Sequence, residues 1–192
     1  MSAIIEGPRV RLVPVEPEAM AARFHAWSNH PATKHLIGDT AYPTPLSARA
    51  GILREQQEVG PERALFAIEV TEGAADALAG WIRLGDFHAE ARRCTVTIVL
   101  GEAEYRGRGL GTEAMRLACR FAFAEMGIER IELGVYDFNT RALRSYEKVG
   151  FVQEARRRRR VYLEGRYYDE IQMGLLREDF RDGPGAAVEV TA

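Results

Sequence analysis

A glycine-rich segment, residues 105–112, lies in the middle of the chain and limits most strongly what the backbone can form there. Glycine lets a chain turn tightly and lets a ligand approach its backbone closely, and it occupies three alternate positions here: Gly107, Gly109 and Gly111. Consecutive N–H groups in such a turn can converge on one anion, and the helix expected at 112–126 adds the positive end of its dipole. The segment therefore predicts an anion site suited to a pyrophosphate, with Arg106 and Arg108 supplying nearby charge.

Two other interpretations of this segment have to be weighed. A glycine-rich surface turn before a helix has the same composition, so the loop alone leaves its function open. The stretch 109–114 also satisfies the G-x-G-x-x-G/A pattern of dinucleotide-binding turns. That fingerprint follows its strand almost directly, whereas eight residues separate Leu100 from Gly109 here. The spacing therefore disfavours a dinucleotide site.

Hydrophobic periodicity and turn residues divide the chain into strands and helices. Strands are expected at 9–15, 64–70, 77–88, 93–100, 129–135, 151–163 and 166–176, and helices at 17–27, 46–59, 112–126 and 139–149. Early strands followed by strands that alternate with helices predict a mixed α/β or α+β sheet covered by helices. Residues 29–63 are expected to form loops around their one helix. A single domain, residues 1–180, and a flexible tail, residues 181–192, complete the predicted organisation.

A second group of polar and aromatic residues, 135–151, overlaps the end of the strand expected at 129–135. Asn139 stands at the start of a predicted helix, where asparagine is among the best N-cap residues. Tyr146 lies one helical turn after Ala142 and therefore on the same face. Taken alone, this face predicts an amphipathic helix packed on the core, with a tyrosine hydroxyl that finds a polar partner.

Composition argues against several function classes. The chain has 26 basic and 28 acidic residues and a net charge of −2, which gives no electrostatic reason to bind nucleic acid. No run approaches the ~20 apolar residues of a membrane span, and the N-terminus lacks the pattern of a signal peptide, so a soluble, cytoplasmic protein is expected. Cys94 and Cys119 belong to no C-x-x-C or histidine–cysteine cluster, so no metal site is expected.

Together, the two segments resemble a known family. The R-x-x-G-x-G sequence that begins at Arg106 and the N-x-x-A-x-x-x-Y-E-K-x-G-F sequence that begins at Asn139 are similar to motifs of the GCN5-related N-acetyltransferase superfamily. The resemblance extends from Arg9 to Leu176 and is strongest toward the branch of ribosomal-protein N-terminal acetyltransferases and spermidine acetyltransferases. It implies a mixed, mostly antiparallel sheet of about six to seven strands with a central splay, flanked by about four helices.

The same resemblance implies acetyl-coenzyme A as cosubstrate and assigns residues to it. The pantetheine arm would lie along the strand 93–100, and Asn139 would reach it. Tyr146 would protonate the leaving thiolate as a general acid. The coenzyme would be bound by backbone groups of the strand and of the loop, namely those of Ile98, Val99, Leu100, Arg106, Gly107, Arg108, Gly109, Leu110, Gly111 and Thr112.

The acceptor that the resemblance implies is a primary amine, with a protein or peptide N-terminus as the main expectation. A small-molecule amine (a polyamine, an amino acid derivative or an antibiotic) and a coenzyme-A-binding module without turnover are the alternatives. Many relatives form dimers, so a homodimer is also considered. Many relatives place a glutamate early in the strand where this chain has Thr95, and the candidates for a general base are Asp86, His88, Glu102, Glu104, Asp137 and Asp169.

Five consecutive arginines, Arg156–Arg160, lie on the first arm of the predicted hairpin 151–176. The simpler interpretation is a solvated edge strand whose charges oppose aggregation. The alternative is a contact for an acidic substrate or a ribosome-associated partner. The run does not favour a cationic polyamine as substrate.

Overall fold

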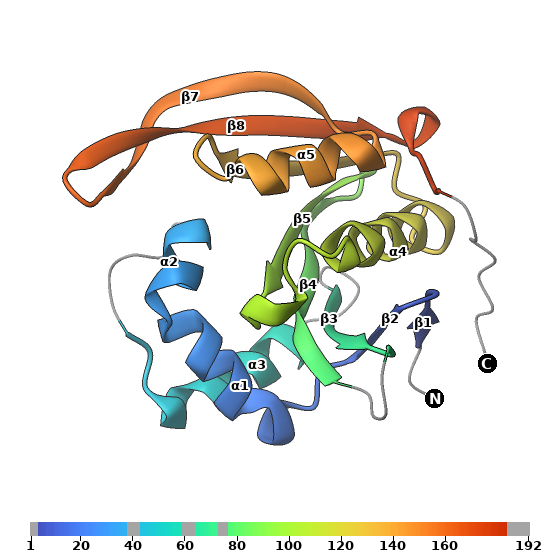
Figure 1. The fold of residues 1–192 in the computed structure, drawn as a ribbon. Helices are drawn as coiled ribbons and strands as arrows, with labels where there is room; N and C mark the ends of the chain where they lie inside the picture. The colour runs from blue at the N-terminus through green and yellow to red at the C-terminus, as the bar shows by residue number, and fades with distance from the viewer. Residues whose placement is uncertain (1–3, 38–42, 59–63, 73–76, 184–192) are drawn as a thin grey trace.

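The computed structural model describes residues 4–37, 43–58, 64–72 and 77–183. Within them, eight strands form one sheet in the order β1-β2-β3-β4-β5-β6-β8-β7 (Figure 1). The strands are β1 (Ile5–Glu6), β2 (Val10–Pro14), β3 (Ala64–Val70), β4 (Ala77–His88), β5 (Arg93–Leu100), β6 (Arg130–Tyr136), β7 (Val152–Leu163) and β8 (Arg166–Leu176). The helices are α1 (Pro17–Asn29), α2 (Pro31–Ile37), α3 (Leu46–Glu58), α4 (Leu110–Ala124) and α5 (Thr140–Val149). This architecture confirms the predicted mixed, mostly antiparallel sheet.

The two faces of the sheet are covered by different helices. Among the apolar residues of α4, Met115 and Cys119 are fully buried in the larger core, and the helix packs against β1, β2, β4 and β5. Phe24 and Trp27 of α1 and Leu53 of α3 form a second core on the opposite face with Val15. Figure 1 shows α4 and α5 on one side of the central strands and α1, α2 and α3 on the other. Because successive side chains of a strand point to opposite faces, the apolar residues of the sheet contribute to both cores.

The sheet opens between β5 and β6, the only parallel neighbours among the described strands. Their pairing is limited to Arg93↔Arg130, Cys94↔Ile131 and Thr95↔Glu132. Beyond Thr95, β5 continues to Leu100 while paired only with β4, and β6 continues while paired only with β8. The expected central splay is confirmed, and it leaves one side of the β5 backbone without a strand partner.

Several element boundaries differ from the sequence-based expectation. The helix α2 falls inside a region predicted to be loop, because a seven-residue helix is too short to show an apolar period. The two-residue strand β1 is missed for the same reason. The described residues therefore form eight strands rather than six to seven, and five α-helices rather than four. The helix α4 begins two residues earlier than predicted, at Leu110, because Gly109 with φ 85° is its N-cap.

Part of the predicted C-terminal tail, residues 184–192, lies outside the described residues. The described part is held against the domain: the Arg181 N–H donates to the carbonyl of Val149 at 2.9 Å. Arg120 of α4 donates to Asp182 at 2.8 Å. Among the described helices, none is both long and apolar enough to cross a membrane.

The arginine run lies on β7, at the edge of the sheet, and its side chains are exposed. The pairing of β7 with β8 shifts between Arg157 and Val161, so residues 158–160 form a bulge opposite Asp169. The Asp169 carboxylate accepts the N–H of Arg159 at 2.8 Å and lies 2.6 Å from Arg156. Charged side chains and a bulge are devices that protect an edge strand from pairing with another chain, which supports the simpler interpretation of the run.

Both cysteines are fully buried, and this gives a prediction about their reactivity. Burial raises the pKa of the Cys94 thiol to about 12 and that of Cys119 well above its ordinary value. Because the thiolate is the reactive form, we expect the native protein to react with an aromatic disulfide reagent at least ~100-fold more slowly than the unfolded protein. Absorbance of the released thiol measures this, and equal rates in the two states would contradict the packing.

Candidate functional site

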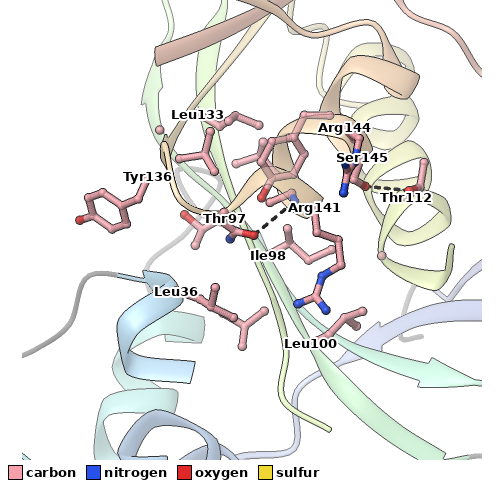
Figure 2. Close-up of a pocket in the computed structure, with 18 of the residues that line it drawn as sticks. Leu36, Thr97, Ile98, Leu100, Thr112, Leu133, Tyr136, Arg141, Arg144 and Ser145 are labelled. Carbon is pink, nitrogen blue, oxygen red and sulfur yellow. Dashed lines mark hydrogen bonds between the residues drawn. The ribbon is translucent and has the colours of Figure 1, made fainter. Parts of the chain in front are cut away.

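A cavity of ≈ 640 Å³ occupies the splay between β5 and β6. Its walls come from α2, β4, β5, β6, β8, α5 and the glycine-rich loop (Figure 2). In Figure 2, Thr97, Ile98 and Leu100 follow β5 along one wall, and Leu133 and Tyr136 lie beyond the opening on β6. Segments that are far apart in the sequence thus meet at the point where the sheet loses its pairing.

The β5 wall offers unpaired backbone groups to a ligand. Residues 97–99 line the cavity and have strand partners only on the β4 side. A strand with one free edge pairs readily with an extended chain that carries its own amides. The predicted coenzyme residues Ile98, Val99 and Leu100 therefore lie together along this edge, although the carbonyl of Leu100 already accepts a hydrogen bond from Arg106 Nε at 2.9 Å.

The glycine-rich loop ends the cavity at the N-terminus of α4. Gly107 and Gly109 have φ of 79° and 85°, a region that other residues rarely adopt. A Cβ placed on Gly107 would meet nothing within 4 Å. No side chain caps α4 at Gly109, and Gly111 and Thr112 line the cavity, so the first N–H groups of the helix are available to an anion.

The guanidinium groups of the two loop arginines are bound by other parts of the protein. Arg106 lines the cavity, but its guanidinium donates to the carbonyl of Gly101 at 2.8 Å and to the hydroxyl of buried Thr33 at 3.2 Å, so it joins the loop to α2. Desolvation, assisted by nearby Arg141, lowers its pKa. Arg108 lies outside the cavity lining and forms an ion pair with Glu72 at 2.8 Å. The backbone N–H of Arg106 donates to the carbonyl of Ala103 at 3.1 Å, so of these two residues only Arg108 has a backbone N–H left to face an anion.

Leu110, also predicted to contact the coenzyme, is fully buried in the core. Its side chain anchors the first turn of α4 and does not line the cavity. Any contribution of Leu110 to ligand binding is therefore restricted to its backbone.

Three of the basic side chains at the cavity belong to α5, and the sequence reasoning missed them. Arg141, Arg144 and Lys148 line the cavity with Ser145, and Figure 2 shows Arg141, Arg144 and Ser145 on this wall. The Ser145 and Thr112 hydroxyls are 2.7 Å apart and connect α5 to α4. Positions three and four apart share a helix face, so this spacing in the sequence was a usable signal of a basic face.

Asn139 and Tyr146 both line the cavity: Asn139 is the N-cap of α5, and Tyr146 lies about two turns further along the helix. The Asn139 side chain accepts the N–H of Ala142 at 3.2 Å and caps the helix. The ring of Tyr146 packs 6.0 Å from that of Phe151, centroid to centroid. Within the described residues its hydroxyl has no hydrogen-bond partner, and burial raises the pKa of Tyr146 to about 12.

Most candidates for a general base lie away from the cavity lining. Glu102 binds Arg23 and the Trp27 indole, and Asp137 and Asp169 both bind Arg156. Glu104 and His88 are exposed and do not line the cavity. Asp86 does line it, together with two carboxylates that were not considered from the sequence, Glu132 and Glu170. Among the described residues, no group of three or more histidine, cysteine or acidic side chains is placed to hold a metal ion.

The basic face of α5 gives a testable prediction. Replacing Arg144 and Lys148 by glutamine removes two charges from the cavity wall, and we expect the Kd for coenzyme A to rise about tenfold at low salt and to depend less on ionic strength. Titration calorimetry at two salt concentrations measures both effects. The matched control replaces Arg158 and Arg166, two exposed arginines outside the cavity; an equal effect there would indicate a nonspecific influence of net charge.

Comparisons with known proteins agree with this geometry. The family model for the acetyltransferase (GNAT) domain matches residues 9–152. The SPbeta prophage-derived uncharacterized N-acetyltransferase YokL of Bacillus subtilis is 38% identical over 76 residues, 40% of this chain and 43% of that protein. The spermidine N(1)-acetyltransferase of Escherichia coli K12 is 28% identical over 102 residues, 53% of this chain and 54% of that protein. The matched segments thus span about half of the length of these two relatives, or less.

A solved structure shows the same fold over a greater length. The spermidine N-acetyltransferase from Vibrio cholerae, in complex with coenzyme A and spermine, has a TM-score of 0.80 at 20% sequence identity. The superposition covers 90% of this chain and 98% of the other. With the family model spanning both the glycine-rich loop and α5, the chain belongs to the GNAT acetyltransferase domain family.

Proposed function

We propose that this protein is an N-acetyltransferase that transfers the acetyl group of acetyl-coenzyme A to a small-molecule primary amine. One observation carries the proposal: the free edge of β5, the glycine-rich loop and Tyr146 line a single cavity. The free edge suits an amide-bearing arm, the loop suits a pyrophosphate, and the tyrosine is a proton donor. These are the three requirements for using a coenzyme A thioester.

The residues present fit acetyl-coenzyme A. The unpaired backbone of residues 97–99 would hold the pantetheine amides, and the N–H groups of residues 107–112 would hold the pyrophosphate, next to an open position at Gly107. Arg144 and Lys148 would neutralise the remaining phosphate charge. When bound, the coenzyme supplies an activated acetyl thioester.

The chain's own groups account for the rest of the chemistry. An unpaired N–H of β5 would donate to the thioester carbonyl and stabilise the charge that develops on its oxygen. The amine nitrogen attacks the acetyl carbon directly, and holding both reactants in one cavity supplies much of the rate. The carbon–sulfur bond breaks and Tyr146 gives its proton to the sulfur. Cys94 and Cys119 are fully buried and outside the cavity lining, so no acyl-cysteine is involved.

The acceptor class is supported by the relatives and by the charges of the cavity. The spermidine acetyltransferases among the relatives favour a small-molecule amine over the peptide N-terminus expected from the sequence. Glu132 and Glu170 each bind arginines, which leaves Asp86 as the cavity carboxylate without an ion pair among the described residues. One available negative charge suits an amine with a single ammonium group better than a polycation.

The test is release of free thiol from acetyl-coenzyme A in the presence of candidate acceptors. We would compare a small monoamine, an amino acid amide, spermidine, an aminoglycoside and a short peptide with a free N-terminus. Turnover with the monoamine or the amide above the others is the expected result, and turnover with the peptide alone would overturn the acceptor class. Clear binding of acetyl-coenzyme A with no turnover for any acceptor would instead indicate a binding module.

A further inference from the structure

We infer that Asp86 is the base that takes the proton of the acceptor amine, and that a β-bulge in β4 exists to present it. This inference rests on the proposed function. Thr95 occupies the strand position where many relatives have a glutamate, so another group has to accept the proton of the amine. The carboxylate comes from the neighbouring strand instead.

The bulge is visible in the pairing of β4 with β5. Gly85 pairs with Thr95 and His88 pairs with Arg93, so two residues of β4, Asp86 and Phe87, oppose one residue of β5. Asp86 has φ 50°, the left-handed conformation that the first residue of such a bulge often adopts when it is glycine. Aspartate tolerates this conformation better than most residues, and residues held in such conformations concentrate at functional sites.

The bulge changes the face to which Asp86 points. Residues opposite each other in an antiparallel pair share a face, so Thr95 lies on the face of Gly85, and regular alternation would send Asp86 to the other face. Instead, the Thr95 hydroxyl donates to Asp86 Oδ2 at 2.8 Å and lies 3.2 Å from the carbonyl of Gly85. Thr95 is also the last residue of β5 paired with β6. The carboxylate is therefore held where the splay opens.

The two other cavity carboxylates are poor bases because arginines engage them. Glu132 binds Arg93 at 3.1 Å with one oxygen and Arg130 at 2.8 Å with the other. Glu170 binds Arg157 at 3.3 Å and Arg160 at 3.5 Å. Asp86 forms no ion pair with any described residue, and its Oδ1 is free of the Thr95 hydrogen bond.

Several ionisable groups belong to the strands packed around Asp86. Arg83 of the same strand reaches alongside Gly85, with its Nε 3.7 Å from the position of a Cβ there. Cys94, opposite the bulge, stays a neutral thiol because burial raises its pKa to about 12. Arg93 of β5 and Arg130 of β6 are already bound to Glu132. None of these three arginines forms an ion pair with Asp86 within the described part of the chain.

Asp86 and Tyr146 exchange protons with the two reactants. A protonated amine gives one proton to Asp86, directly or through water, and attacks as the neutral amine. The nitrogen–carbon bond forms, the carbon–sulfur bond breaks, and the nitrogen loses its second proton to solvent. The sulfur receives one proton from Tyr146, and Asp86 and Tyr146 return to their starting states through solvent. The net products are the amide, the free thiol and one proton.

The test is Asp86→Asn, because asparagine also adopts the left-handed conformation and can still accept the Thr95 hydrogen bond. We expect kcat/KM for an alkylamine of pKa ~10.4 to fall about 100-fold at pH 7. The loss should shrink as the pH approaches the pKa of the amine, and it should be smaller for an α-amine of pKa ~8. The Kd for acetyl-coenzyme A and the Tm should stay at wild-type values. Asp137→Asn, at a partly exposed carboxylate outside the cavity, is the matched control.

The other outcomes separate this inference from the proposed function. Wild-type activity of Asp86→Asn at all pH values would overturn the role of Asp86 and leave the transferase in place. A loss of Tm and of acetyl-coenzyme A binding, with no change in the pH profile, would assign Asp86 a structural role and overturn the inference equally. Absence of thiol release by the wild-type protein with every amine would overturn the proposed function, and the inference with it.

Discussion

Replacing Tyr146 by phenylalanine is expected to lower kcat for acetyl transfer by about 10²–10⁴-fold, the usual contribution of a positioned general acid. The Kd for acetyl-coenzyme A should change less than twofold, because the ring packing against Phe151 is retained and the hydroxyl has no hydrogen-bond partner among the described residues. Burial raises the pKa of Tyr146 to about 12, so the group stays a phenol at every ordinary assay pH. We therefore expect no loss of rate from its ionisation until the pH approaches that value.

Tyr136→Phe is the matched control, because Tyr136 also lines the cavity and burial also raises its pKa. It lies on β6, beyond the splay from the β5 edge (Figure 2), and its hydroxyl has no assigned step. A comparable loss of kcat in both variants would contradict the acid role of Tyr146. So would parallel losses of kcat and acetyl-coenzyme A affinity in Tyr146→Phe, which would indicate a packing role only.

A phenol with a raised pKa is a weak acid, and the same burial explains why it suffices. Desolvation of the Tyr146 side chain penalises its phenolate, and it penalises in the same way a thiolate that leaves beside it. Proton transfer from Tyr146 to the sulfur is then less unfavourable than it is in water.

The sequence predicted best those features that depend on neighbouring residues. The bounds expected for the strands at 64–70, 77–88 and 93–100 agree with β3, β4 and β5, because turn residues and alternation mark them locally. Asn139 was expected to cap its helix and does so. Predicting these features requires only the side-chain periods of strands and helices, 2.0 and 3.6 residues, and the residue preferences of helix caps. All of these can be recognised in a single sequence.

Side-chain directions that depend on distant segments could not be predicted. The Arg106 guanidinium is drawn away from the loop by Thr33, 73 positions away, and that of Arg108 by Glu72, 36 positions away. The role of Asp86 depends on a bulge that becomes visible only when β4 and β5 are paired. Neither the hydrogen-bond partners of these arginines nor the pairing register of β4 and β5 can be predicted from neighbouring residues. An arginine next to the glycine motif in sequence therefore does not have to place its charge at the ligand.

The strongest test of the glycine-rich loop is Gly107→Val, for which we expect the Kd for acetyl-coenzyme A to rise by more than about 100-fold. A β-branched residue at φ 79° is strained by at least ~1–2 kcal/mol, so the loop would relax and its N–H groups would no longer converge. The added side chain would also occupy space that is open in the protein. Titration calorimetry measures the affinity, and thermal unfolding measures the cost to stability.

Gly165→Val separates loss of the ligand site from general strain. Gly165 has φ 84°, and a Cβ there also meets nothing within 4 Å, but it lies in the turn between β7 and β8, outside the cavity lining. Both variants should lose similar amounts of Tm, because the same backbone conformation is penalised in each. Only Gly107→Val should lose affinity, since only there do the N–H groups face the ligand. Equal affinities in the two variants would mean that the pyrophosphate binds elsewhere, and the basic face of α5 would then be the remaining anion site.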